Sequence, residues 1–190
     1  MLIYLLLFFL CAFPLLLGDN AFGSDLLRKK YAFFIIFLIS CVAGLRDKIG
    51  GYDVYIYGEF FDGLSLKDFE DGSYVMNLLF EKGYTLYCYF IHLFTDNRYV
   101  FFFITSIISY LLVSKSMKLC EEIILFSLFI FFCKYFLMSF VYVRQFLAMG
   151  IVWLAVPFII SRNFLKFSIV VLLASTLHSS AFVFFPTYFI

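Results

Sequence analysis

Long runs of apolar residues are the feature that most constrains how this chain of 190 residues can fold. Eight runs follow one another: Leu2–Leu17, Tyr31–Leu45, Tyr84–Phe94, Tyr99–Val113, Ile123–Phe140, Phe146–Ile160, Phe164–Leu177 and Ala181–Ile190. In total 65% of the residues are hydrophobic and 14% are charged, against about 45–50% and about 25% in soluble domains. A soluble domain of this size leaves roughly 30% of its unfolded surface exposed. It could not bury so many apolar side chains, so lipid must be the solvent for much of the chain, which excludes a simple soluble enzyme and a disordered chain.

These runs predict an all-α fold, a polytopic transmembrane helix bundle that forms a single membrane domain over residues 1–190. Leu2–Leu17 lacks a basic leader and an obvious cleavage site, so we interpret it as a retained span and not as a signal peptide. Tyr84–Phe94 is too short for the ~20 residues that a crossing needs, so we expect a re-entrant or interfacial helix there. Ala181–Ile190 stops within a span, which predicts a chain truncated at its C-terminus.

Basic residues in the short loops set the expected orientation, because such loops face the cytoplasm. Three of them carry Arg28, Lys29 and Lys30; Lys115 and Lys118; and Arg162 and Lys166. All three face inward only if Tyr84–Phe94 does not cross. The segment 46–98 is then a long external loop with nine acidic and five basic residues. Within it, Leu64–Phe80 mixes apolar and acidic residues and is predicted to form an amphipathic helix on the membrane surface.

Charge and cysteine content exclude several classes of function. The net charge of +1 predicts no nucleic-acid partner. The five cysteines show neither CxxC spacing nor a Cys/His pattern, so we interpret them as small apolar packing residues and predict no metal site and no cofactor.

Five polar residues lie where the topology puts the external side: Arg46, Asp53, Glu81, Arg144 and His178. An arginine at a helix end either binds phosphate bidentately or snorkels. A carboxylate at the start of a helix is stabilised by the helix dipole. An imidazole is either a structural hydrogen-bonding residue or a base. Together they suit a pyrophosphate: arginines neutralise the leaving group, while a carboxylate or imidazole positions or deprotonates the attacking hydroxyl.

Several short motifs contain these residues in order. They are Ala43-Gly44-Leu45-Arg46, Gly51-Tyr52-Asp53-Val54-Tyr55, Glu81-Lys82-Gly83-Tyr84, Val143-Arg144-Gln145-Phe146-Leu147-Ala148 and His178-Ser179-Ser180-Ala181. In them the sequence resembles the EpsG family, Wzy-like membrane proteins of exopolysaccharide assembly. The resemblance implies a multi-pass protein of the bacterial inner (plasma) membrane that joins polyprenyl-pyrophosphate-linked repeat units on its external face. It implies catalytic roles for Asp53 and His178, and substrate binding by Arg46, Arg144, Gln145 and Glu81.

The first functional hypothesis is therefore a glycosyltransferase-type polymerase for exopolysaccharide, capsule or O-antigen. Its partners would be a polyprenyl-pyrophosphate-linked oligosaccharide, the lipid bilayer and other polysaccharide assembly proteins. Two alternatives remain open. A transporter or flippase for lipid-linked sugars would place polar residues deep in several spans, where Lys134 is the obvious example. The other alternative is an inactive fragment of a polymerase.

Overall fold

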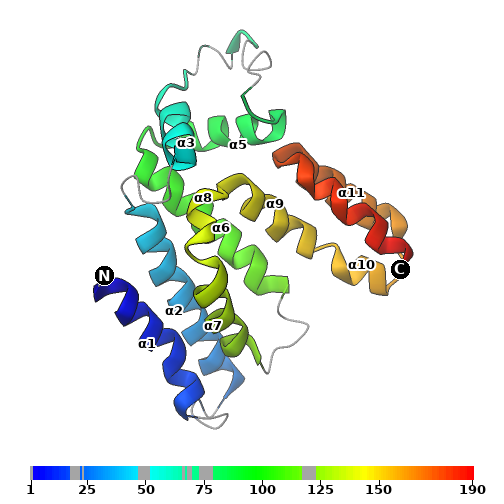
Figure 1. The fold of residues 1–190 in the computed structure, drawn as a ribbon. Coiled ribbons are helices and arrows are strands. Elements are labelled where there is room, and N and C mark those ends of the chain that lie inside the picture. The colour runs from blue at the N-terminus through cyan, green and yellow to red at the C-terminus, as the bar shows by residue number, and fades with distance from the viewer. Residues whose placement is uncertain are drawn as a thin grey trace.

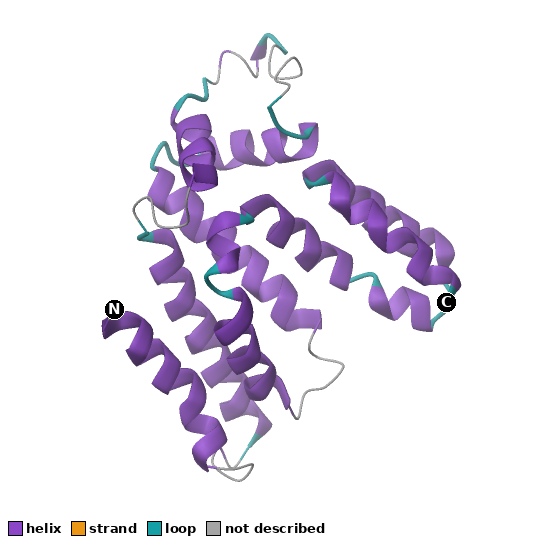
Figure 2. Cartoon of the chain, in the orientation of Figure 1, coloured by secondary structure: helices purple, strands orange, loops and turns teal. Residues whose placement is uncertain are grey.

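The computed structural model describes residues 2–17, 22, 24–46, 52–65, 67, 70–72, 79–116 and 123–190. Regular structure in these ranges is helical throughout, and none of it is strand (Figure 2). The prediction of an all-α fold is confirmed. The predicted helix over Leu64–Phe80 falls largely outside the described residues.

Most of the helices follow the apolar runs of the sequence, and one more, over Tyr52–Asp62, lies outside all eight runs (Figure 1). In chain order they are α1 (Leu2–Leu17), α2 (Asp25–Gly44), α3 (Tyr52–Asp62), α5 (Lys82–His92), α6 (Arg98–Ser116), α7 (Ile124–Tyr135), α8 (Met138–Val141), α9 (Val143–Trp153), α10 (Val156–Ile160), α11 (Phe164–Leu177) and the 3-10 helix η4 (Ser179–Phe189). Ser24 caps α2 by accepting a hydrogen bond from the Leu27 N–H. Asn163 caps α11 in the same way through the Lys166 N–H.

Two runs that the sequence predicts as continuous helices are broken. Ile123–Phe140 becomes α7 and α8. The N–H of Phe136 bonds to the carbonyl of Phe131, five residues earlier, and this departure from the i−4 pattern of an α-helix ends α7. The run up to Ile160 divides into α9 and α10 two residues before Pro157. Proline lacks an N–H and its ring clashes with the carbonyl four residues earlier, so the local bonds tighten to the i−3 pattern at 154 and 155.

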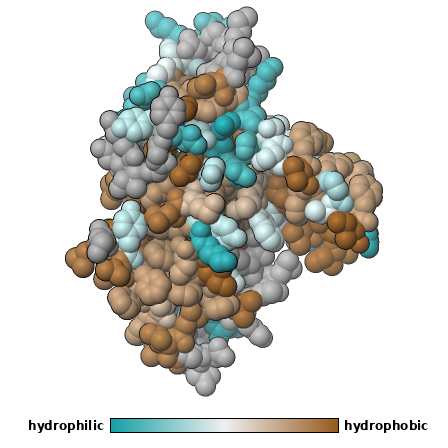
Figure 3. Space-filling model, in the orientation of Figure 1, coloured by the Kyte–Doolittle hydropathy of each residue, from teal (hydrophilic) through white to brown (hydrophobic). Residues whose placement is uncertain are grey.

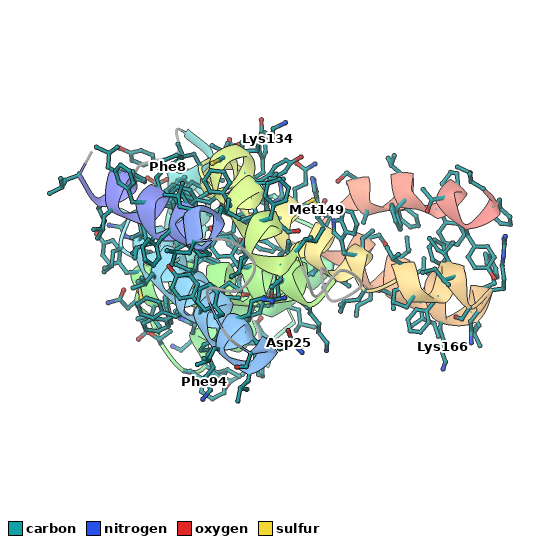
Figure 4. The ribbon with its side chains drawn as sticks, turned by 90° about the horizontal axis from the view of Figure 1, so that it is seen from below. Phe8, Asp25, Phe94, Lys134, Met149 and Lys166 are labelled. Carbon is teal, nitrogen blue, oxygen red and sulfur yellow. The ribbon has the colours of Figure 1, made fainter. Side chains whose placement is uncertain are left out.

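The helices form a bundle with a projecting arm. α6 packs against both α2 and α9, and α1 packs against α7. α11 and η4 pair with each other beside α9 and extend from the bundle, with Lys166 near the far end (Figure 4). The short helix α5 lies across the end of the bundle where α3 is also found, and the N-terminal end of α2 lies at the other end (Figure 1).

Apolar side chains cover much of the outside of the molecule. Among the described residues, two segments are long and apolar enough to cross a membrane. They are Arg98–Lys115 of α6 and Val143–Ile160, which contains α9 and α10, and only 33% and 39% of them is buried. The helix of a soluble core would be mostly buried. Hydrophilic residues gather instead towards the end that carries α3 and α5 (Figure 3). With 11 residues, α5 is about 16 Å long at 1.5 Å per residue, which is about half the thickness of the hydrocarbon core.

Candidate functional site

A partly buried network of polar residues is centred on the carboxylate of Glu81. One oxygen, Oε1, lies 3.0 Å from Nδ1 of His178 and accepts a hydrogen bond of 2.9 Å from the backbone N–H of Ser179. The other oxygen, Oε2, is paired with the guanidinium of Arg144. The side chains of all three charged partners are about one fifth to one quarter exposed. Residues far apart in the sequence therefore meet at one end of the bundle.

Close contact between α5 and α11 brings Glu81 to His178. Glu81 is the N-cap residue of α5, yet its side chain does not cap the helix. It points instead to His178, whose extended backbone ends α11. Two residues into α5, a β-carbon on Gly83 would come within 2.3 Å of the hydroxyl oxygen of Thr176. Only a residue without a side chain lets the helices approach this closely.

Arg144 enters the network from the first turn of α9. Its Nε donates a hydrogen bond of 3.3 Å to the hydroxyl of Tyr57 on α3. The guanidinium also lies over three aromatic rings, with its central carbon 4.5 Å from the centroid of Phe80 and under 6 Å from those of Tyr57 and Tyr84. The rings and the carboxylate fix its position, while its bonds to Glu81 and Tyr57 use two of its five N–H donors.

The surroundings of Glu81 determine its protonation state. Burial of the carboxyl favours the neutral form, but hydrogen bonds from Ser179 and His178 and the charge of Arg144 outweigh that effect and lower the pKa of Glu81 to about 2. Glu81 is therefore ionised at neutral pH and can only accept hydrogen bonds. Nδ1 of His178 must therefore carry the proton that it shares with Glu81, so the neutral tautomer compatible with this contact has its lone pair on Nε2.

Arg46 is buried beside this network and not in it. Its guanidinium is sandwiched between the rings of Phe102 and Phe140, with 4.6 Å to each centroid, and the residue is only 4% exposed. None of its three side-chain nitrogens has a hydrogen-bond partner among the described residues. A small cavity of about 10 Å³ adjoins it, lined also by Arg98. Cation–π contacts compensate only part of the cost of burying an unpaired charge.

The other predicted site residues lie apart from the network. Asp53 is in the first turn of α3, where the helix dipole stabilises its negative charge. No bond among the described residues joins it to Glu81, Arg144 or His178. Gln145 is exposed next to Arg144. Lys134, the residue that a transporter would place deep in a span, is exposed in the last turn of α7.

Two contributors to the network have no signal in the sequence. The ring of Phe80 supports Arg144, and the Ser179 N–H binds Glu81. Tyr57 is one of several tyrosines that the sequence assigns equally well to an interfacial belt. Its hydrogen bond from Arg144 of α9, which distinguishes it from the other tyrosines, is seen only in the structure. Among the described residues no group of three or more His, Cys, Asp or Glu side chains could hold a metal ion, and the four described cysteines are unpaired.

Comparison with known proteins identifies the family. The model of the EpsG family matches residues 29–190, which include Arg46, Glu81, Arg144 and His178. The chain belongs to the EpsG family. The resemblance in the short motifs is thus confirmed, and the EpsG match extends beyond them in both directions. No curated protein and no solved structure matches the chain. Membership of the EpsG family indicates a membrane protein with a role in polysaccharide biosynthesis.

Proposed function

We propose that this protein polymerises polyprenyl-pyrophosphate-linked oligosaccharide units, and that the network of Glu81, Arg144 and His178 is the site of the reaction. The observation that carries the proposal is the contact of an ionised carboxylate with both a guanidinium and an imidazole at one end of an apolar bundle. An amphiphilic substrate of this kind would sit with its glycan at that end and its lipid among the helices.

The proposed reaction is a glycosyl transfer. The hydroxyl oxygen of the acceptor unit attacks the anomeric carbon of the donor glycan, and a new C–O bond forms. The bond between that carbon and the pyrophosphate oxygen breaks, and its electron pair leaves with polyprenyl pyrophosphate. Nε2 of His178 takes the hydroxyl proton, while Glu81 holds the ring in the required tautomer. Arg144 stabilises the charge that develops on the pyrophosphate through its remaining donors.

Arg46 is proposed as a second anion-binding group. A buried guanidinium with unpaired donors is costly unless an anion pairs with it. Replacing Arg46 by methionine distinguishes a role in the reaction from a role in stability. Replacement by methionine should leave the melting temperature unchanged or higher, because an apolar side chain suits the site between two phenylalanine rings, while polymer yield falls. A polymer yield equal to that of the wild type would show that Arg46 does not bind an anion needed for the reaction.

The main test replaces Arg144 in the full chain and measures polymer length and yield in cells that lack the native gene. Arg144→Ala should lose about a hundredfold or more in the rate of polymer formation, the usual effect of removing a charge-stabilising donor. Arg144→Lys should recover only part, because lysine cannot bind bidentately. Lys166→Ala, at the far end of the arm, is the control. Polymer of wild-type length and yield from Arg144→Ala would refute the proposed role.

A further inference from the structure

An apolar groove lies between α5, α9 and α11. It has a volume of about 460 Å³, which falls in the usual range for a ligand site. Its walls include Leu86, Tyr87 and Phe90 of α5, Ile151 of α9 and Leu173 of α11. Leu86, Phe90 and Leu173 are each about half exposed, so the groove is open along its length.

One end of the groove adjoins the charged network. Gly83, two residues after Glu81, and Leu177, the neighbour of His178, both belong to its lining. A molecule that lies in the groove therefore comes close to Glu81 and His178 at this end. Arg144 is not part of the groove lining, but its guanidinium is paired with Glu81, two residues before the lining residue Gly83, which puts a cationic group near this end of the groove.

This combination selects an amphiphile with an anionic head group. We propose that the groove binds the part of the polyprenyl chain next to the pyrophosphate, with the pyrophosphate at Arg144. This inference rests on the proposed function and deepens it by assigning the lipid to α5, α9 and α11. A neutral phospholipid would fill the same channel but would gain nothing from Arg144, and that difference separates the two occupants.

Two adjacent leucines of α11 provide a matched test. Leu173 lines the groove, whereas Leu172 does not, and the two are similarly exposed at 57% and 47%. We expect Leu173→Trp to weaken binding of polyprenyl pyrophosphate to the purified full chain by about tenfold, which corresponds to the exclusion of about two methylene groups. Binding of inorganic pyrophosphate should not change, and Leu172→Trp should change neither.

The outcomes distinguish this inference from the proposed function. Equal binding of polyprenyl pyrophosphate by both tryptophan variants would overturn the groove assignment alone. Displacement of polyprenyl pyrophosphate by an equal concentration of neutral phospholipid would also overturn it. If Arg144→Ala binds both pyrophosphates as tightly as wild type, the proposed function itself fails. Should Leu173→Trp not fold, a photoreactive residue at Leu86 must crosslink to labelled polyprenyl pyrophosphate, and the absence of a crosslink contradicts the assignment.

Discussion

Glu81 is the residue through which the other charged groups of the network are connected. Its two oxygens serve different partners, His178 with the Ser179 N–H on one side and Arg144 on the other. The same carboxylate thus fixes which imidazole nitrogen carries the shared proton and holds the guanidinium in position. The sequence presents Glu81 as the residue before a short helix, for which a favourable interaction with the helix dipole is sufficient explanation. Its partners come from α9 and α11, and nothing local in the chain indicates them.

The lowered pKa of Glu81 predicts a pH-dependent stability. The folded protein binds fewer protons at Glu81 than the unfolded chain between the usual value of 4.5 and about 2. The stabilisation is therefore complete above pH 4.5 and is lost as the pH falls through about 2. We expect Glu81→Gln to lower the melting temperature at pH 7, and the difference from wild type to close between pH 4.5 and 2.

Glu59 provides the control for that comparison, because it is exposed on α3. Glu59→Gln should follow wild type at every pH. A difference between Glu81→Gln and wild type that stays constant from pH 7 to pH 2 would show that the Glu81 carboxylate does not supply the stabilisation.

At the scale of the elements, the apolar runs predict the positions of most helices. They do not predict the breaks between α7 and α8 and between α9 and α10. Pro157 is a visible signal for the second break, since proline interrupts the hydrogen-bond ladder of a helix. The break at Phe136 has no comparable residue, and it depends on a local change of hydrogen-bond register. The length of Tyr84–Phe94 correctly predicts that α5 is too short to cross a bilayer.

The contact between α5 and α11 gives a prediction at this scale. A methyl group on Gly83 would overlap Thr176, including its backbone carbonyl oxygen at 2.7 Å. Gly83→Ala must therefore separate the two helices, which moves Glu81 away from His178. We expect a destabilisation of about 1–3 kcal/mol, the usual cost of overpacking, together with loss of polymer.

Gly58→Ala is the matched control, because Gly58 is also helical and its added methyl group would meet its nearest neighbour at an ordinary 3.6 Å. This variant should be as stable as wild type or up to about 1 kcal/mol more stable, since alanine is the better helix former. Unfolding measured with denaturant compares the two variants. Equal stability and equal polymer yield from Gly83→Ala and wild type would contradict the packing argument.

At the scale of the whole molecule, the network lies at the end of the bundle opposite the N-terminal end of α2, which carries Arg28 to Lys30 (Figure 1). From the positive-inside rule we expect that basic end to be cytoplasmic and the network to face the outside. The sequence predicts that the network and this basic segment lie at opposite ends of the bundle, because short basic loops and apolar runs are local features. It does not anticipate that Arg46 is enclosed by Phe102 and Phe140, since that depends on how three separate elements pack.

Labelling of single cysteines tests this orientation. In a background without the five native cysteines, a cysteine replacing exposed Asp96 should react with a membrane-impermeant maleimide in intact cells. A cysteine replacing Lys166 should react only after the membrane is permeabilised. The reverse pattern, or reaction of both in intact cells, would invalidate the orientation.

Reconstitution gives the most direct test of the central claim, that Glu81, Arg144 and His178 catalyse glycan polymerisation. The full chain would be purified into proteoliposomes with lipid-linked repeat units as the only substrate, and glycan length and free polyprenyl pyrophosphate would be measured together. We expect one polyprenyl pyrophosphate to be released for each new bond, and both products to be lost in Arg144→Ala and in His178→Ala. Polymer formed by either variant at the wild-type rate, or passage of intact lipid-linked units across the bilayer without bond formation, would contradict the central claim.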